Sequence, residues 1–252
     1  MKTYCYLDFG NSRVKAWICF GNTVIDRFSY THRLDVDSFF LELPQSFQSD
    51  VREVVVASVL DTPTNQRFVE IARQYWGLDP IFVVSSATHG LLRNGYVDPG
   101  RLGVDRWLNA LAVADRECCC VVSCGTALTL DLVSDHQHQG GYILPGYHLQ
   151  LHALIHGTQK VRPTSIVETL SLTPGCTTED AVHRGVLLGM LGAIERTVSD
   201  FKARNGRQCS LVLTGGDADK LAPHLAIPHD IIPELILLGL QRYTGRVESE
   251  RC

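Results

Sequence analysis

The chain has 252 residues, of which 45% are hydrophobic and 20% charged, so it has room and composition for one large globular domain or two ordinary ones. Its formal net charge is −4 and it has no block of basic residues, which argues against a dedicated nucleic-acid surface. No apolar run approaches the ~18 residues of a membrane span, and Asp8 interrupts the early apolar run that a signal peptide would need. We therefore expect a cytoplasmic protein that binds neither membrane nor nucleic acid.

The first half of the chain alternates expected strands with expected helices. Three strands with tight connections are predicted over residues 4–9, 14–20 and 23–30. Next come a helix near 36–43, a buried strand at 51–59, a helix at 65–75 and a strand at 80–85. This order is typical of a layered α/β domain.

The second half begins after a glycine-containing loop at 85–104 and a predicted helix at 105–116. The segment CCCVVSCGTALTLDLV then indicates strand, loop and strand, and the polar turn SDHQHQGG leads to a third strand, YIL. A long helix is expected from Thr177 to the stop signal Asn205-Gly206, followed by the strand SLVLT and a helix at 233–243.

Nine cysteines could indicate disulfides, but Cys118, Cys119 and Cys120 are consecutive. Neighbouring side chains of a strand point to opposite faces, so we interpret these three as small buried hydrophobic residues. The chain has no CxxC pair that would indicate zinc.

The two halves repeat one pattern, in which a loop of small residues joins the first two strands of a meander. Aligning CYLDFGNSRVKAWI with CCVVSCGTALTLDLV matches Asp8 with Ser123, Gly10 with Gly125 and Asn11 with Thr126. An internal repeat of this size predicts two related domains, 1–115 and 116–252, with a ligand cleft between them.

The two repeated loops are the first candidates for chemistry. Glycine-containing loops after strands can turn backbone N–H groups toward phosphate oxygens. Lys15 would add a positive charge, and Asp8 could hold Mg²⁺ directly or through water. The alternative is a pair of ordinary hairpins, because Gly-Asn and Gly-Thr are common in turns.

Two further features allow both a functional and a structural interpretation. Asp105 and Arg106 stand at a helix start, either as a reactive pair or as an N-terminal acid beside a surface arginine. Gly215-Gly216 follows a strand, where it would let a flat ring such as adenine approach or would form only a turn. The glycines at 185, 189 and 192 make a small-residue stripe on the long helix, which favours close packing against another helix, including one across a dimer.

Six motifs in this order resemble the type III pantothenate kinases, and the likeness covers nearly the whole chain. They are DFGNSRVK, YVDPGRLGVDR, CGTALTLD, GGYILPG, TTEDAVHRG and LTGGDA. The resemblance implies an α/β, actin-like ATPase (ribonuclease-H-like) fold of two duplicated domains with a central cleft. It also implies ATP-dependent phosphorylation of pantothenate, the first step of coenzyme A biosynthesis, with Mg²⁺ and usually as a homodimer.

The resemblance also implies roles for particular residues. Asp105 becomes the general base, and the pantothenate contacts become Tyr96, Gly103, Val104, Arg106 and Thr178. The ATP contacts become Asp8, Phe9, Gly10, Asn11, Ser12, Arg13, Val14, Lys15 and Thr126, with Asp8 also at the metal.

The sequence departs from the family's pattern at Ser123, where the family commonly has an aspartate that binds potassium or ammonium. A neutral hydroxyl is a poorer cation ligand than a carboxylate. We therefore expect either activity independent of a monovalent cation or a compensating positive group at this place.

Two other functions stay open at this point. The chain could be another actin-like kinase that phosphorylates a sugar or a carboxylic acid, although GVDR favours pantothenate. It could also be a nucleotide-binding regulator without catalysis, because some relatives of the family were first described as accessory factors in transcriptional control. Asp105 and the first loop are intact, and the net negative charge does not suit DNA binding.

Overall fold

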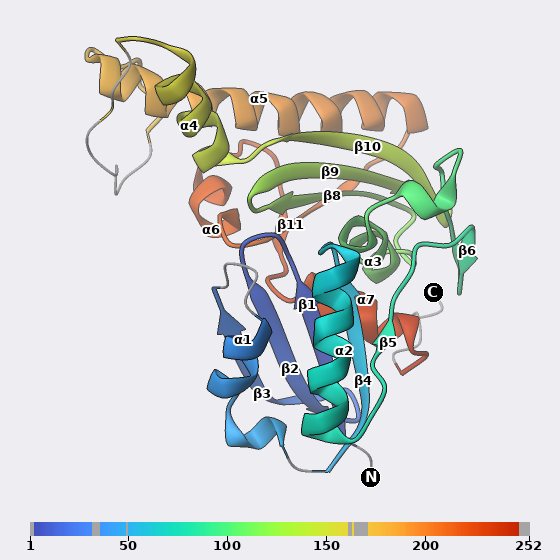
Figure 1. The fold of residues 1–252 in the computed structure, drawn as a ribbon. Coiled ribbons are helices and arrows are strands. Elements are labelled where there is room, and N and C mark those ends of the chain that lie inside the picture. Colours follow the sequence, from blue (N-terminus) through green and yellow to red (C-terminus); the bar gives the residue numbers. More distant parts are fainter. Residues whose placement is uncertain (1–2, 32–35, 49, 161–162, 164–170, 247–252) are drawn as a thin grey trace. The chain divides into compact units, whose positions relative to one another are not determined.

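A computed structural model describes residues 3–31, 36–48, 50–160, 163 and 171–246 (Figure 1). The chain divides into two compact units. Unit 1 comprises the described residues of Met1–Asp115 and Leu235–Cys252, and unit 2 comprises those of Arg116–Glu234. None of the described helices is both long and apolar enough to cross a bilayer.

Unit 1 is built on a sheet with the strand order β3-β2-β1-β4-β5. Its strands are β1 (Thr3–Phe9), β2 (Val14–Phe20), β3 (Thr23–Tyr30), β4 (Val51–Ser58) and β5 (Ile81–Phe82). The first three form an antiparallel meander, whereas β4 is parallel to β1 and β5 is parallel to β4. These strands are the predicted ones, except that the strand expected at 80–85 is shorter.

The helices of unit 1 include several that bury apolar side chains in its core. They are α1 (Val36–Glu42), η1 (Gln45–Phe47), α2 (Thr62–Trp76), η2 (Pro99–Arg101), α3 (Val104–Ala112) and α7 (Leu235–Tyr243). Phe39 of α1 and Phe68 of α2 pack against Phe9 of β1 in edge-to-face contacts. The glycine-containing loop also holds a short hairpin that the sequence did not predict, made of β6 (Thr88–His89) and β7 (Leu92–Arg93).

The C-terminal helix α7 belongs to unit 1, whereas the division expected from the sequence assigned it to the second domain. A Cβ atom on Gly239 would lie 2.2 Å from the carbonyl oxygen of Leu108, so α7 and α3 approach at backbone distance. Arg242 of α7 also donates to both carboxylate oxygens of Asp115, at 2.8 and 2.7 Å. Such a bidentate pair fixes geometry as well as charge, and it ties α7 to the segment that follows α3.

Unit 2 repeats the topology of unit 1 with the strand order β12-β11-β8-β9-β10. Its strands are β8 (Cys118–Cys124), β9 (Ala127–Ser134), β10 (Gln137–Pro145), β11 (Ser210–Thr214) and β12 (Asp230–Ile231). Here too an antiparallel meander is followed by two parallel strands. The repeat expected from the sequence is thus present in the sheet topology itself.

The predicted turn SDHQHQGG is wrong in its extent, because β10 begins inside it at Gln137. The reversal needs only Asp135 and His136, whose φ values of 51° and 57° are those of a tight hairpin turn. A shift of register between His138 and Gly141 then absorbs the glycines within the strand.

The helices of unit 2 are α4 (Tyr147–Gly157), α5 (Thr178–Asn205), α6 (Ala218–Leu221) and η3 (Ala222–His224). The long helix α5 has the predicted ends, since Thr177 caps it by accepting the N–H of Asp180 and Gly206 closes it at φ 64°. In Figure 1, α5 extends along the sheet, and its buried residues Leu187, Met190 and Ile194 join the core formed with β8, β9 and β11.

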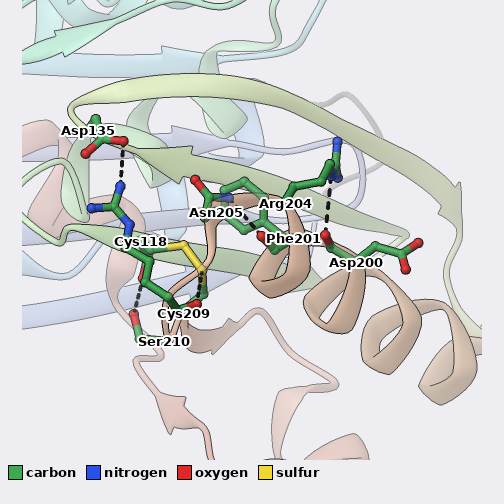
Figure 2. Close-up of a disulfide and its surroundings, with 9 residues drawn as sticks. Cys118, Asp135, Asp200, Phe201, Arg204, Asn205, Cys209 and Ser210 are labelled. Carbon is green, nitrogen blue, oxygen red and sulfur yellow. Dashed lines mark hydrogen bonds and ion pairs between the residues drawn. A yellow bond between two sulfur atoms is a disulfide. The ribbon is translucent and has the colours of Figure 1, made fainter.

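The interpretation of the cysteines is wrong for Cys118, which forms a disulfide with Cys209 (Figure 2). Ser210 of β11 pairs with Cys119 of β8, so the two bonded cysteines stand one position before this pair, with Cα atoms 4.6 Å apart. That distance is within the range a disulfide requires. Cys119 and Cys120 are buried and take no part in a disulfide, as expected.

Candidate functional site

The first loop lies between β1 and β2 in unit 1. The N–H of Gly10 donates to the carbonyl of Arg13 at 3.1 Å, and a Cβ on Gly10 would lie 3.3 Å from the same oxygen. Asn11, Ser12 and Arg13 are exposed at the tip of this turn. The flanking Phe9 and Val14 are buried in the core of the unit, so they anchor the loop by packing.

Asp8 is a partly buried carboxylate at the end of β1, directly opposite Lys15 of β2. Burial raises the pKa of Asp8 to about 7, against the attraction of Lys15, and the negative charge of Asp105 adds to the increase. The structure therefore brings Asp8, Lys15 and Asp105 into one electrostatic neighbourhood within unit 1. A carboxylate that a fold retains although its ionisation costs stability is typical of a functional site.

Asp105 stands in the first turn of α3, where the helix N-terminus favours a negative charge. A Cβ atom on Gly103 would lie 2.7 Å from the carboxylate oxygen Oδ1 of Asp105. A side chain at this position would displace the carboxylate, while Val104 packs into the apolar core beside it. Gly103 thus permits the observed orientation of Asp105.

Arg106 is buried on α3, with 4% of its surface exposed. Its guanidinium donates to the hydroxyl of Tyr96 at 2.6 Å and lies 5.7 Å from the centre of that ring. The two residues are ten positions apart, so this contact fixes the loop before α3 against the helix.

Asn94 organises the same loop, and the sequence analysis missed it. Its side-chain oxygen accepts the N–H of Tyr96 at 2.9 Å, and its amide donates to the carbonyls of Ser86 and Pro99 at 3.1 and 3.2 Å. An asparagine two residues before a tyrosine gives no sign of these partners in the sequence, because two of them come from other parts of the loop.

The second loop, Gly125-Thr126, joins β8 to β9 in unit 2 and is enclosed by backbone. The N–H of Gly146 donates to Thr126 O at 3.0 Å, and the N–H of Asp217 donates to Cys124 O at 3.0 Å. Cβ atoms on Gly146 and Gly215 would lie 2.2 Å from Gly125 O and 2.4 Å from Cys124 O. The motifs GGYILPG and LTGGDA therefore supply the glycines that hold this loop from two sides.

The remaining expected residues of unit 2 lie at defined places. Ser123 stands in register between Thr129 of β9 and Thr214 of β11, so three hydroxyl side chains form a row across the sheet. Thr178 is exposed at the first position of α5. Ser123, Thr126 and Thr178 thus belong to unit 2, whereas the other expected site residues belong to unit 1.

Known structures place the chain in a structural class. A protein from Campylobacter jejuni, assigned to the Baf family of transcriptional activators, superimposes with a TM-score of 0.64 and 21% identity, covering 96% of this chain and 97% of that one. MreB 5 of Spiroplasma citri, solved with AMPPNP, superimposes with a TM-score of 0.54 and 11% identity, covering 97% and 96%. The chain is an α/β protein of the actin-like ATPase fold, as its sequence motifs predicted.

Sequence comparison identifies the family within this class. The profile of the type III pantothenate kinases matches residues 5–200. A type III pantothenate kinase of Acinetobacter baylyi is 42% identical over 243 residues, covering 94% of this chain and 96% of that protein. One of Acinetobacter baumannii is 39% identical over 249 residues, covering 97% and 98%. The chain belongs to the type III pantothenate kinase family.

The pKa of Asp8 gives a first testable prediction. The unfolded chain releases this proton near pH 4 and the folded chain only near pH 7, so ionisation of Asp8 reduces stability as the pH rises between these values. Asp8→Asn should therefore increase the free energy of unfolding at pH 8, on the order of 2 kcal/mol, and change it little near pH 4. Urea unfolding at both pH values measures this difference.

Asp26→Asn is the matched control for Asp8→Asn, because hydrogen bonds from Ser46 and from the Arg27 N–H lower the pKa of Asp26. Its effect on stability should have the opposite sign at pH 8. Equal stabilities of Asp8→Asn and the wild type at pH 8 would contradict a cost in stability from the partly buried Asp8 carboxylate.

Proposed function

We propose that this chain transfers the γ-phosphoryl group of ATP to the hydroxyl of pantothenate, forming 4′-phosphopantothenate, with Asp105 as the general base. The activity is inferred from membership of the type III pantothenate kinase family. The residue roles rest on the neighbourhood of Asp8, Lys15 and Asp105 within unit 1, where a carboxylate, a cation and a second carboxylate influence one another. The product is the first intermediate of coenzyme A biosynthesis.

The residues of the first loop suit the phosphates of ATP and their Mg²⁺. Phosphoryl transfer requires mainly positioning and stabilisation of charge on the transferred group. A carboxylate such as Asp8 suits Mg²⁺ directly or through water, and the positive charge of the metal would favour the ionised form of Asp8. Lys15 would stabilise phosphate charge, and the turn at Gly10–Arg13 with Thr126 of the second loop would provide further contacts with ATP.

The residues around α3 suit pantothenate. A general base must lie within hydrogen-bond reach of the attacking hydroxyl, and Asp105 would accept its proton as the phosphoryl group transfers. Pantothenate carries a carboxylate, for which the planar guanidinium of Arg106 is a suitable partner. Tyr96, which already contacts Arg106, together with Gly103, Val104 and Thr178 would complete the substrate contacts.

Asp105→Asn tests this assignment, because an amide cannot accept the proton of the attacking hydroxyl. Pantothenate-dependent ADP release should fall about 10²- to 10⁴-fold, while the dissociation constant for ATP, measured by calorimetry, should change little. Asp79→Asn, an exposed carboxylate after α2, is the matched control and should keep wild-type turnover. Asp105→Asn turnover within a few-fold of wild type would overturn the role of Asp105.

A wild-type enzyme that binds ATP without any pantothenate-dependent turnover would overturn the proposed activity itself. A panel of sugars and carboxylic acids would then test the other actin-like kinase function.

We propose that no monovalent cation is required. The row of Thr214, Ser123 and Thr129 offers neutral hydroxyls where a carboxylate would be needed to hold potassium or ammonium firmly. Turnover in potassium-free buffer should therefore change less than about 2-fold when potassium or ammonium is added, and Ser123→Asp should introduce activation by these ions. Many-fold activation of the wild-type enzyme by potassium would contradict this proposal.

We also propose a homodimer formed through α5. A Cβ atom on Gly185, Gly189 or Gly192 would meet no described atom within 4 Å apart from the backbone of neighbouring turns of α5, and Leu188 on the same face of the helix is 63% exposed. Next to this face lies a groove between α5 and β10, whose Ile143 is 64% exposed. An open face of glycines and apolar side chains permits close packing against a second helix.

Sedimentation of the purified protein tests the homodimer. The wild type should sediment as a dimer, and Gly189→Trp should shift it to the monomer with little loss of thermal stability, because the indole has open space within one chain. Gln66→Trp on α2 is the control and should stay dimeric. A monomeric wild type at micromolar concentration would rule out this interface.

The proposed compartment is the cytoplasm, where ATP is supplied. Fractionation of cells should recover the protein with the cytoplasmic enzymes.

A further inference from the structure

A tyrosine and a histidine join α4 to α5 in unit 2. The hydroxyl of Tyr147, the first residue of α4, lies 2.7 Å from Nδ1 of His183 on α5. Their rings are nearly parallel, with centres 6.1 Å apart. Tyr147 is half-buried against the core of the unit, and His183 is 5% exposed. The contact is therefore a directed hydrogen bond in largely apolar surroundings.

Packing alone does not account for this pair. His183 Nε2 is buried and has no hydrogen-bond partner within the described part of the chain. A buried polar atom without a partner reduces stability, and two apolar side chains of similar size would fill the same space without that cost. What the polar pair supplies is therefore one hydrogen bond of defined direction and length, which two apolar side chains could not form.

One end of the bond reaches the second loop through the backbone. Tyr147 directly follows Gly146, whose N–H donates to Thr126 O and whose Cα leaves no room for a side chain against Gly125 O. Gly146 therefore cannot shift without moving Gly125-Thr126. A contact that holds Tyr147 in place therefore also holds one side of the Gly125-Thr126 loop.

The other end of the bond reaches the start of α5. His183 lies five residues after Thr178, the first residue of the helix, and Gly175 packs against the backbone of Asp180 and Ala181 in the same turn. A Cβ on Gly175 would lie 2.4 Å from the N of Ala181, so this end of α5 is held tightly. The Tyr147–His183 bond thus connects the loop that holds Thr126 with the helix end that carries Thr178.

The surroundings keep the tyrosine hydroxyl protonated. Burial, followed by the negative charge of Asp217, raises the pKa of Tyr147. Asp217 itself lies in the turn that holds Cys124 from the other side of the loop. The hydroxyl therefore remains available for the bond to His183 over the working pH range.

We propose that Tyr147 and His183 are positioning residues for ATP binding, whose hydrogen bond holds the second phosphate loop in place against the first turns of α5. This inference rests on the proposed function, which assigns ATP to Thr126 and pantothenate to Thr178. Neither side chain needs to touch a substrate. Both act through Gly146 and α5.

Tyr147→Phe removes one hydroxyl and keeps the ring. A neutral hydrogen bond of this kind is worth about 3- to 10-fold in an equilibrium constant, so the KM for ATP should rise by about that factor while kcat falls less than 3-fold. His183→Leu should behave the same way. His183→Asn keeps an amide that can donate or accept near the position of Nδ1 and should hold the KM for ATP within 2-fold of wild type.

Tyr30→Phe, on β3 of unit 1, is the control for loss of a tyrosine hydroxyl and should leave both constants unchanged. A purely structural role predicts equal losses of melting temperature in the Tyr147 and His183 variants without any change in KM. That result, or His183→Asn as impaired as His183→Leu, overturns the proposal.

The dissociation constant for ATP, measured by calorimetry, separates this inference from the proposed function. If the wild type lacks pantothenate-dependent turnover, the proposed function fails, yet Tyr147→Phe should still weaken ATP binding by about 3- to 10-fold. An unchanged dissociation constant in Tyr147→Phe contradicts the positioning role whether or not the enzyme turns over.

Discussion

The rest of the structure depends on two short glycine-containing turns, to which the proposed function assigns ATP. Each turn follows the first strand of a sheet and precedes the second, at Gly10 in unit 1 and at Gly125 in unit 2. A turn of this kind is intrinsically weak, because glycine loses more conformational freedom on folding than any other residue. The sheets and helices around each turn supply the rigidity that the turn itself lacks.

The two units provide this rigidity differently. In unit 1 the flanking residues Phe9 and Val14 hold the turn by burial among the aromatic side chains of α1 and α2. In unit 2 the turn is held by backbone against backbone, through Gly146 on one side and Gly215 on the other. A backbone contact at this distance leaves no space for the methyl group of an alanine. The glycines of these motifs, which look like parts of simple turns in the sequence, are therefore required by packing.

The sequence predicts most of this architecture because the relevant signals are local. Short apolar runs separated by turn residues mark the meanders, and the cap at Thr177 with the stop at Gly206 marks α5. What it could not predict depends on contacts between distant residues. The disulfide joins Cys118 to Cys209 only because β11 lies beside β8, and α7 joins unit 1 only because Gly239 admits the backbone of α3.

The same reasoning explains which parts of the site were predictable. Asp8, Lys15 and Asp105 carry charges in unusual places, so they are visible as candidates in the sequence. Asn94 was missed because its function is to accept and donate hydrogen bonds to backbone groups that no sequence pattern reveals. The predicted start of β10 was wrong because two residues in left-handed conformation make the turn that the sequence pattern extended over eight residues.

The two duplicated units have the same topology around the turn but place chemically different side chains at equivalent positions. In unit 1 the position two residues before the loop glycine holds Asp8, and its cross-strand partner is Lys15. In unit 2 the equivalent position holds Ser123, and its partner is Thr129. Burial already raises the pKa of Asp8 to about 7, so each such carboxylate has a cost in stability. A chain that keeps the carboxylate in one copy and a hydroxyl in the other bears that cost once, while both copies retain the same glycine-containing backbone turn.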